Sequence, residues 1–170
     1  EVPEDGFTWD EFDAVCQQLM DNKETLGIKH ATLINDYGIK TILPYMWQNG
    51  VEYTNEDETK CNLADPKTVE AVEYIKSLVD AGYIPPIEKL DEGSFPIVGM
   101  LNSGEIAMGR VALWEALKLE DSETLDYQVM HAPYGNDGTK RGSPLYKHLG
   151  NCIYVKEQRS GYGVREICNK

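Results

Sequence analysis

The stretch SGEIAMGRVALWEAL, residues 103–117, combines a strand signal, a glycine turn and the start of a helix. Residues 105–108 are mostly apolar and bounded by glycines, which predicts a short buried strand. Gly109 then lets the backbone turn, and the apolar residues from Val111 to Leu117 follow at helical spacing. Open α/β sheets bind ligands at the C-terminal ends of their strands, so this stretch predicts the edge of a ligand pocket.

Trp114 lies about one turn into that predicted helix and has two interpretations. Its ring packs into the hydrophobic core, or it faces a cleft and offers a flat apolar surface to a ligand. The stretch by itself leaves both interpretations open.

The composition is that of one domain, or of one lobe of a larger protein, with 170 residues of which 41% are hydrophobic. The chain carries 29 acidic and 16 basic residues, a net charge of −13. This balance disfavours nucleic acid and anionic membranes, because both need Lys and Arg for neutralisation. We interpret the acidity as a contribution to solubility.

The chain begins at Glu1 without a methionine, and no apolar run approaches the ~18 residues that span a bilayer. With no signal peptide either, we expect a processed or cut piece from which any targeting segment has been removed. The four cysteines include no CxxC pair, which argues against a zinc knuckle or a thioredoxin-like site. They permit a disulfide without requiring one.

Two helix starts have clear capping signals. Thr8 and Glu11 form a capping box before the apolar stripe of residues 9–20, and Asp65-Pro66 places an N-cap and a first-turn proline before a helix that ends near Gly82. In this second helix we expect one buried face, made of Val69, Val72, Ile75, Leu78 and Val79.

The remaining elements follow from apolar runs and turn residues. We expect a helix at residues 39–48 with Pro44 in its first turn, and a short helix at residues 95–102. Residues 51–62 are predicted to form a solvated loop or hairpin. Besides residues 105–108, strands are expected at residues 31–34, 127–130 and 151–155.

The sequence offers little sign of catalysis, metal binding or phosphate binding. His30, His131 and His148 have no GxSxG or equivalent nucleophile motif near them, and no glycine loop of the phosphate-binding kind is present. With 29 acidic residues a pair of carboxylates can always be found, so the presence of such a pair is hardly evidence for a glycosidase. We therefore expect no catalytic residues, no cofactor and no metal.

Aromatic and small polar residues gather at the predicted strand ends and helix starts, which is typical of a sugar-binding repertoire. These candidates are Asn35, Asp36, Tyr37, Tyr45, Trp47, Arg110, Trp114, Glu115, Tyr134, Tyr146 and Asn151. Each has a structural alternative: Trp47 belongs to the core of its helix, Asp36 forms a turn, and Arg110 pairs with Glu105 or Glu115.

In order and spacing, the chain resembles the second lobe of the family 1 extracellular solute-binding proteins, the capture subunits of ABC importers for carbohydrates. The matching pieces are Thr8-Trp9-Asp10-Glu11-Phe12, Met46-Trp47-Gln48-Asn49-Gly50, Asp65-Pro66 with Ala71-Val72, Phe95 through Ser103–Met108 to Trp114, Tyr127 to Pro133 with Gly135, and Leu149-Gly150 to Lys156. Each motif is loose alone, and the series along residues 3–156 is more specific.

The resemblance implies an α/β fold, a single lobe of the periplasmic-binding-protein-like type II fold with a small mixed sheet flanked by helices. Residues 1–156 are then the second, C-terminal lobe, residues 157–170 are a tail that departs from the family pattern, and the first lobe is absent. Sugar would bind in the cleft between two lobes, and the family's secretion implies a cell-surface lipoprotein or a periplasmic protein. Its partners are then a carbohydrate and the ABC permease, with no nucleic acid, and a membrane only through a lipid anchor absent from this chain.

The resemblance also ranks the candidate ligand-binding residues by how well each matches a ligand-binding position of the family. Trp114 lies where the family commonly places an aromatic ring under the sugar, and Asn35, Asp36 and Tyr37 lie on a strand-end loop that supplies polar and aromatic contacts. Trp47, Glu115 and Asn151 are weaker assignments, and Arg110 comes from the residue pattern. Two rival classes stay open: a carbohydrate-active hydrolase with two facing carboxylates, and a protein-interaction domain with a flat aromatic patch.

Overall fold

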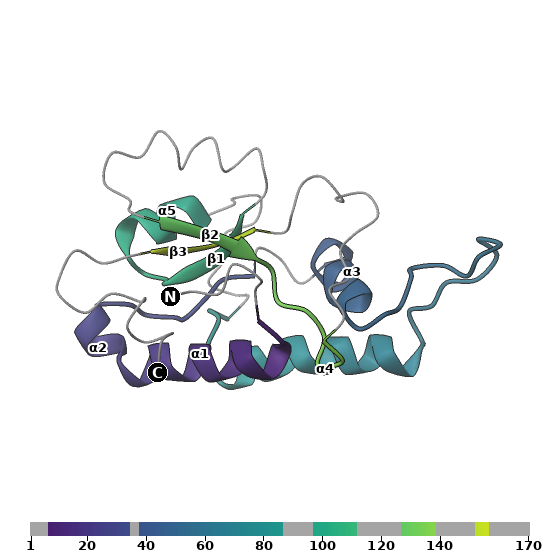
Figure 1. Ribbon diagram of the computed structural model, residues 1–170, viewed down its shortest axis with the longest axis horizontal. Coiled ribbons are helices and arrows are strands. Elements are labelled where there is room, and N and C mark those ends of the chain that lie inside the picture. The colour runs from purple at the N-terminus through teal and green to yellow at the C-terminus, as the bar shows by residue number, and fades with distance from the viewer. Residues whose placement is uncertain (1–6, 35–37, 87–96, 112–126, 139–151, 157–170) are drawn as a thin grey trace.

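The computed structural model describes residues 7–34, 38–86, 97–111, 127–138 and 152–156 of the chain (Figure 1). Its helices are α1 (Trp9–Asp21), α2 (Lys23–Leu26), α3 (Ile39–Gln48), α4 (Pro66–Asp80) and α5 (Ile97–Ser103). Its strands are β1 (Met108–Val111), β2 (Tyr127–His131) and β3 (Cys152–Lys156).

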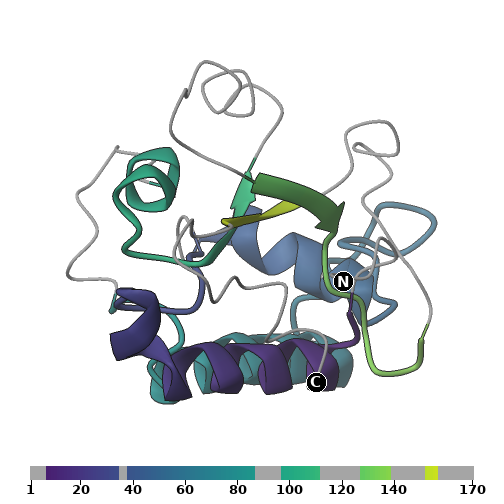
Figure 2. The same ribbon diagram turned by 60° about the vertical axis from the view of Figure 1, so that its left-hand side comes forward.

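The three strands form a small sheet in the order β1-β3-β2, with antiparallel pairing throughout. The described part of the chain adds parallel pairing as isolated bridges, Thr8 with Tyr134 and His30 with Ile106. Helices α1 and α4 lie side by side on one side of the sheet, and α5 packs beside β1 (Figures 1 and 2). The expected α/β lobe, with a small sheet and flanking helices, is therefore the observed architecture.

Helix α1 begins where the capping box predicts. The Thr8 hydroxyl accepts from the Glu11 backbone N–H, and the Glu11 carboxylate accepts from the Thr8 backbone N–H at 2.8 Å. The Glu11 carboxylate also accepts from the Thr8 hydroxyl at 2.9 Å. The hydrogen bonds that it receives from Thr8, the backbone one first and the hydroxyl one second, lower the pKa of Glu11. The predicted stripe of Trp9, Phe12, Val15, Cys16 and Leu19 is buried, so both the start and the inward face of α1 are confirmed. The short α2, which follows directly, was not expected.

Helix α4 also begins as predicted, since the Asp65 carboxylate accepts from the Lys67 backbone N–H at 2.9 Å. Its buried face was predicted in part wrongly. Val69 and Val72 are exposed, and Thr68 is buried in their place. The Thr68 hydroxyl donates to the Asn62 carbonyl at 2.9 Å, which satisfies its only polar side-chain group inside the protein.

The strand predicted at residues 105–108 lies further along the chain. The ladder runs from Met108 to Val111, and Gly109 lies inside it opposite Tyr154 rather than at a turn. A Cβ atom on Gly109 would lie 2.6 Å from Ile97 Cδ1, so this glycine allows α5 to approach β1 closely. Val111 was predicted to start a helix and is the last residue of β1, while residues 112–126 lie outside the described part of the chain.

Two further expectations were wrong in part. Residues 31–34 are buried as predicted but belong to no named strand; the Ala31 carbonyl accepts from Met108 N–H at 3.0 Å, and Thr32 N–H donates to the Tyr83 carbonyl at 3.1 Å. Pro44 lies in the interior of α3 rather than in its first turn. The helix nevertheless has the expected bounds, and Gly50 follows it with a φ of 80°.

The other predicted elements are confirmed with small shifts. Helix α5 and strands β2 and β3 lie where the apolar runs predict them, and the loop after α3 closes as a hairpin through an antiparallel bridge between Thr54 and Cys61. The larger part of the core joins α1, α2 and α4 to residues 28–34, and a smaller cluster joins Leu33 to Ile97, Leu101, Ile106 and Val111. The two clusters meet under the sheet through the buried segment 31–34.

Candidate functional site

Three chain segments that carry predicted ligand residues meet at one end of the sheet. Val111, the last residue of β1, pairs with Cys152, the first residue of β3, and Cys152 also pairs with His131 at the end of β2. Asn151 directly precedes Cys152 in the sequence, and Trp114 follows three positions after Val111. The antiparallel register therefore places Val111 opposite Cys152, and these are the residues from which the chain continues toward Trp114 and Asn151.

A small hollow lies at this end of the sheet and adds the third segment. It is lined by Phe12, Thr32, Leu33, Ile34, Tyr45, Gln48, Arg110, Ala132 and Pro133. Ile34 directly precedes Asn35, so the attachment point of the residue 35–37 loop faces the same hollow as Arg110. The hollow has a volume of about 20 Å³, the space that one water molecule needs.

A chain of contacts holds Gln48 at the wall of the hollow. The Trp9 ring stacks on Tyr74 with a centroid separation of 4.4 Å and an interplanar angle of 3°. The Tyr74 hydroxyl donates to the Trp9 carbonyl at 3.2 Å, and burial raises the pKa of Tyr74. With its ring held in this way, the Trp9 indole Nε1–H donates to Gln48 Oε1 at 2.9 Å. The Gln48 amide is thus oriented, with its Nε2 group left as a donor.

Two of the predicted candidates, Arg110 and Tyr45, line the hollow. The alternative that Arg110 pairs with Glu105 is wrong, because the Glu105 carboxylate is bound by Lys29 Nζ at 3.0 Å. No carboxylate of the described residues forms an ion pair with the Arg110 guanidinium.

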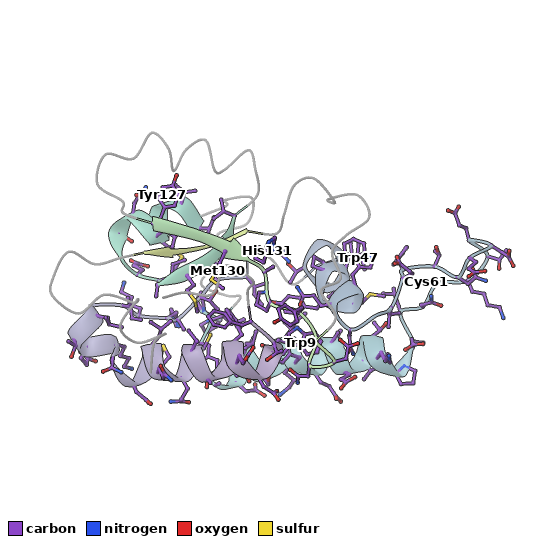
Figure 3. All side chains as sticks on the ribbon, in the orientation of Figure 1. Trp9, Trp47, Cys61, Tyr127, Met130 and His131 are labelled. Atoms are coloured by element: carbon purple, nitrogen blue, oxygen red, sulfur yellow. The ribbon has the colours of Figure 1, made fainter. Side chains whose placement is uncertain are left out.

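Trp47 does not belong to the lining of this hollow. In Figure 3 its ring lies on the side of α3 away from α4. Its indole Nε1 is buried and has no hydrogen-bond partner within the described ranges. Tyr134 lies after β2 and forms the bridge to Thr8, away from the lining of the hollow. The other seven candidates lie outside the described part of the chain: Asn35, Asp36, Tyr37, Trp114, Glu115, Tyr146 and Asn151.

Sequence reasoning missed two polar residues of the hollow, Gln48 and Thr32, which are 3% and 4% exposed. Gln48 lies in the Met46–Gly50 motif, where a polar side chain on an otherwise apolar helix was a usable signal. Thr32 lies in an apolar run, and nothing in its surroundings distinguished it from a core residue.

Within the described ranges, no group of three or more His, Cys, Asp or Glu side chains could hold a metal ion. The same part of the chain contains no helix of the length and apolarity that a membrane crossing requires.

The family model of the bacterial extracellular solute-binding proteins matches residues 2–159. The chain belongs to this family. The members of this family are solute-binding proteins rather than enzymes. A search of curated proteins finds no match.

Among solved structures, the chain is similar to an ABC substrate-binding protein from Listeria monocytogenes in complex with cycloalternan. The two are 22% identical with a TM-score of 0.62, and the match covers 99% of this chain. This likeness concerns the fold. The chain spans 40% of the length of that structure, which is consistent with a single lobe of a solute-binding protein.

Proposed function

We propose that this chain is the second lobe of an extracytoplasmic solute-binding protein that captures an oligosaccharide for an ABC importer. The observation that carries the proposal is the meeting of three segments, marked by Ile34, Val111 and Cys152, at one end of the sheet beside a small hollow. Membership of the solute-binding family supports it, as does the fold shared with a structure that holds the oligosaccharide cycloalternan.

In this proposal, residues 1–156 form the lobe, residues 157–170 are a tail, and a first lobe supplies the facing wall of the cleft. Trp114 stacks on a sugar ring, because an indole face matches the apolar C–H face of a pyranose. Asn35, Asp36, Tyr37, Glu115 and Asn151 bind hydroxyls, and Arg110 contacts the ligand from the hollow. Trp47 on α3 offers a further aromatic surface at the border of the site.

The ligand in this proposal stabilises the closed arrangement of the two lobes by as much as it prefers the closed form over the open one. The permease subunits of the importer then recognise the closed form. The protein acts outside the cytoplasm, as a cell-surface lipoprotein or in the periplasm, and catalyses no reaction.

The test is calorimetry on the whole protein with a panel of oligosaccharides, with and without the Trp114→Ala substitution. We expect at least one oligosaccharide to bind, and Trp114→Ala to raise its Kd about tenfold because a stacking surface is lost. The melting temperature should change little. If Trp114→Ala lowers the melting temperature strongly and leaves the Kd unchanged, the ring belongs to the core and the assigned site is wrong.

A further inference from the structure

An exposed histidine lies in the row of residues that forms one end of the sheet. His131, the last residue of β2, is opposite Cys152 of β3, and Cys152 is opposite Val111 of β1. Strands β1 and β2 therefore both reach this row with their C-terminal ends. Open α/β sheets bind ligands beyond such strand ends, so the row borders the place where a ligand is expected.

The register of the strands decides on which face of the sheet the His131 side chain lies. Successive strand residues point to opposite faces, and Met130 is buried in the larger core cluster. His131 therefore points to the other face, which it shares with Val111 and with Tyr127 at the start of β2. On that face Val111 is buried in the smaller core cluster, and Tyr127 packs against it.

The smaller core cluster, which includes residues of α5, does not extend to His131, because this side chain is exposed. No hydrogen bond or ion pair joins its imidazole to another residue in the described ranges. Figure 3 shows His131 at the end of β2 that is nearer to α3, the helix that follows the residue 35–37 loop. The apolar face of the sheet thus ends in a solvent-facing group that donates and accepts hydrogen bonds.

The chain around His131 continues into segments that carry proposed ligand residues. Asn151 directly precedes Cys152, the strand partner of His131. The two residues that follow His131 line the hollow together with Ile34, from which the residue 35–37 loop begins. His131 therefore lies between the segments whose meeting carries the proposed function.

We propose that His131 is a further ligand-binding residue, whose imidazole forms hydrogen bonds with hydroxyl groups of the captured oligosaccharide. This inference rests on the proposed function. An uncharged imidazole donates from one ring nitrogen and accepts at the other, which suits hydroxyl groups because each of them also does both. When a first lobe closes over the sugar, water is excluded and these hydrogen bonds become stronger.

Direct contact is tested by nuclear magnetic resonance at constant pH on the whole protein labelled with ¹⁵N-histidine. The probe is the tightest binder in a panel of neutral disaccharides and trisaccharides of glucose, mannose and xylose. We expect it to shift the ring-nitrogen signals of His131, identified with His131→Gln, and the shift should saturate at the Kd measured by calorimetry. His30 is the internal control, because its Nδ1 lies 3.1 Å from the Gly82 carbonyl oxygen and its bridge partner Ile106 precedes β1, at the other end of that strand from Val111.

Calorimetry with the same sugar tests what the imidazole contributes. His131→Ala should raise the Kd about three- to tenfold, the usual effect of one lost hydrogen bond. His131→Gln keeps a donor and an acceptor and should restore most of the affinity. Lys23→Ala, which shortens an exposed side chain on α2, should leave the Kd unchanged.

Monodeoxy analogues of the sugar identify the hydroxyl that His131 binds. The analogue without that hydroxyl should bind more weakly than the parent sugar to the wild-type protein, but nearly as tightly as the parent sugar to His131→Ala. A change that reaches His131 only through closure of the lobes would not couple to one particular hydroxyl.

The outcomes separate the two proposals. If the sugar binds and no monodeoxy analogue couples to His131→Ala, His131 is not a ligand contact and the capture of oligosaccharides stands. Unchanged His131 ring-nitrogen signals at saturating sugar would lead to the same conclusion without any variant. If no sugar of the panel binds, both proposals are overturned.

Discussion

Gly109 allows β1 and α5 to pack closely, because a methyl group at this position would lie 2.6 Å from Ile97 Cδ1 and 2.8 Å from Ile97 Cγ1. Ile97 is fully buried in the smaller core cluster, where close-packed neighbours resist a shift of its side chain. At the residue scale, the site therefore depends on the lack of a side chain at Gly109. This residue packs against Ile97 of α5, and the next residue of β1, Arg110, lines the hollow.

We expect Gly109→Ala to lower the free energy of unfolding by about 1–3 kcal/mol, the usual cost of overpacking a core. Gly99→Ala is the matched control, because a methyl group there meets nothing within 4 Å and lies in a helix that prefers alanine. Urea unfolding measures both. In an Ile97→Ala background the cost of Gly109→Ala should shrink; an equal cost in both backgrounds would show that the clash is not its cause.

At the scale of the elements, helix α4 separates features that neighbouring residues set from features that tertiary contacts set. Helix α4 starts at Asp65 because its carboxylate binds a first-turn amide and Pro66 needs no hydrogen-bond partner for its nitrogen. Its rotation about its axis depends on contacts instead. Asn49 on the loop after α3 donates to the Lys67 carbonyl and to Glu70, both at 2.8 Å, and Tyr74 stacks on Trp9. These contacts turn Val69 and Val72 outward.

For α4 we predict that Asp65→Ala lowers the free energy of unfolding by about 1 kcal/mol, whereas Asp65→Asn changes it by only a few tenths, since asparagine caps helices as well as aspartate does. Equilibrium urea unfolding followed by far-ultraviolet circular dichroism measures both variants. Equal losses in the two variants would mean that charge, rather than capping, is what Asp65 contributes.

At the scale of the whole molecule, the candidate site lies at one end of a small sheet, and the chain spans 40% of the length of the similar structure. A sugar between two lobes is shielded from water, which strengthens its hydrogen bonds, whereas on one lobe it stays hydrated on its open face. We predict that this chain alone binds oligosaccharide weakly or not at all, while the whole protein binds it. Calorimetry on both, with the same sugar, is the measurement. Sub-micromolar binding by this chain alone would contradict the two-lobed site.

The candidate site was predictable from the sequence only in part. Arg110 was chosen for its place after an apolar run, and the structure puts it in the hollow. Trp47 was chosen as an aromatic residue at a helix end, and α3 instead turns its neighbour Gln48 toward the hollow. The orientation of Gln48 comes from Trp9, 39 positions earlier, and no local pattern carries that contact.

Helix starts, the inward stripe of α1 and the class of the fold were determined by the sequence itself, because capping and periodicity act between residues no more than four apart. The tertiary structure decided the place of Gly109 in a strand, the outward direction of the α4 valines and the orientation of Gln48. Their causes are Ile97, Asn49, Tyr74 and Trp9, partners distant in the chain, whose positions are known only once the helices have packed on the sheet.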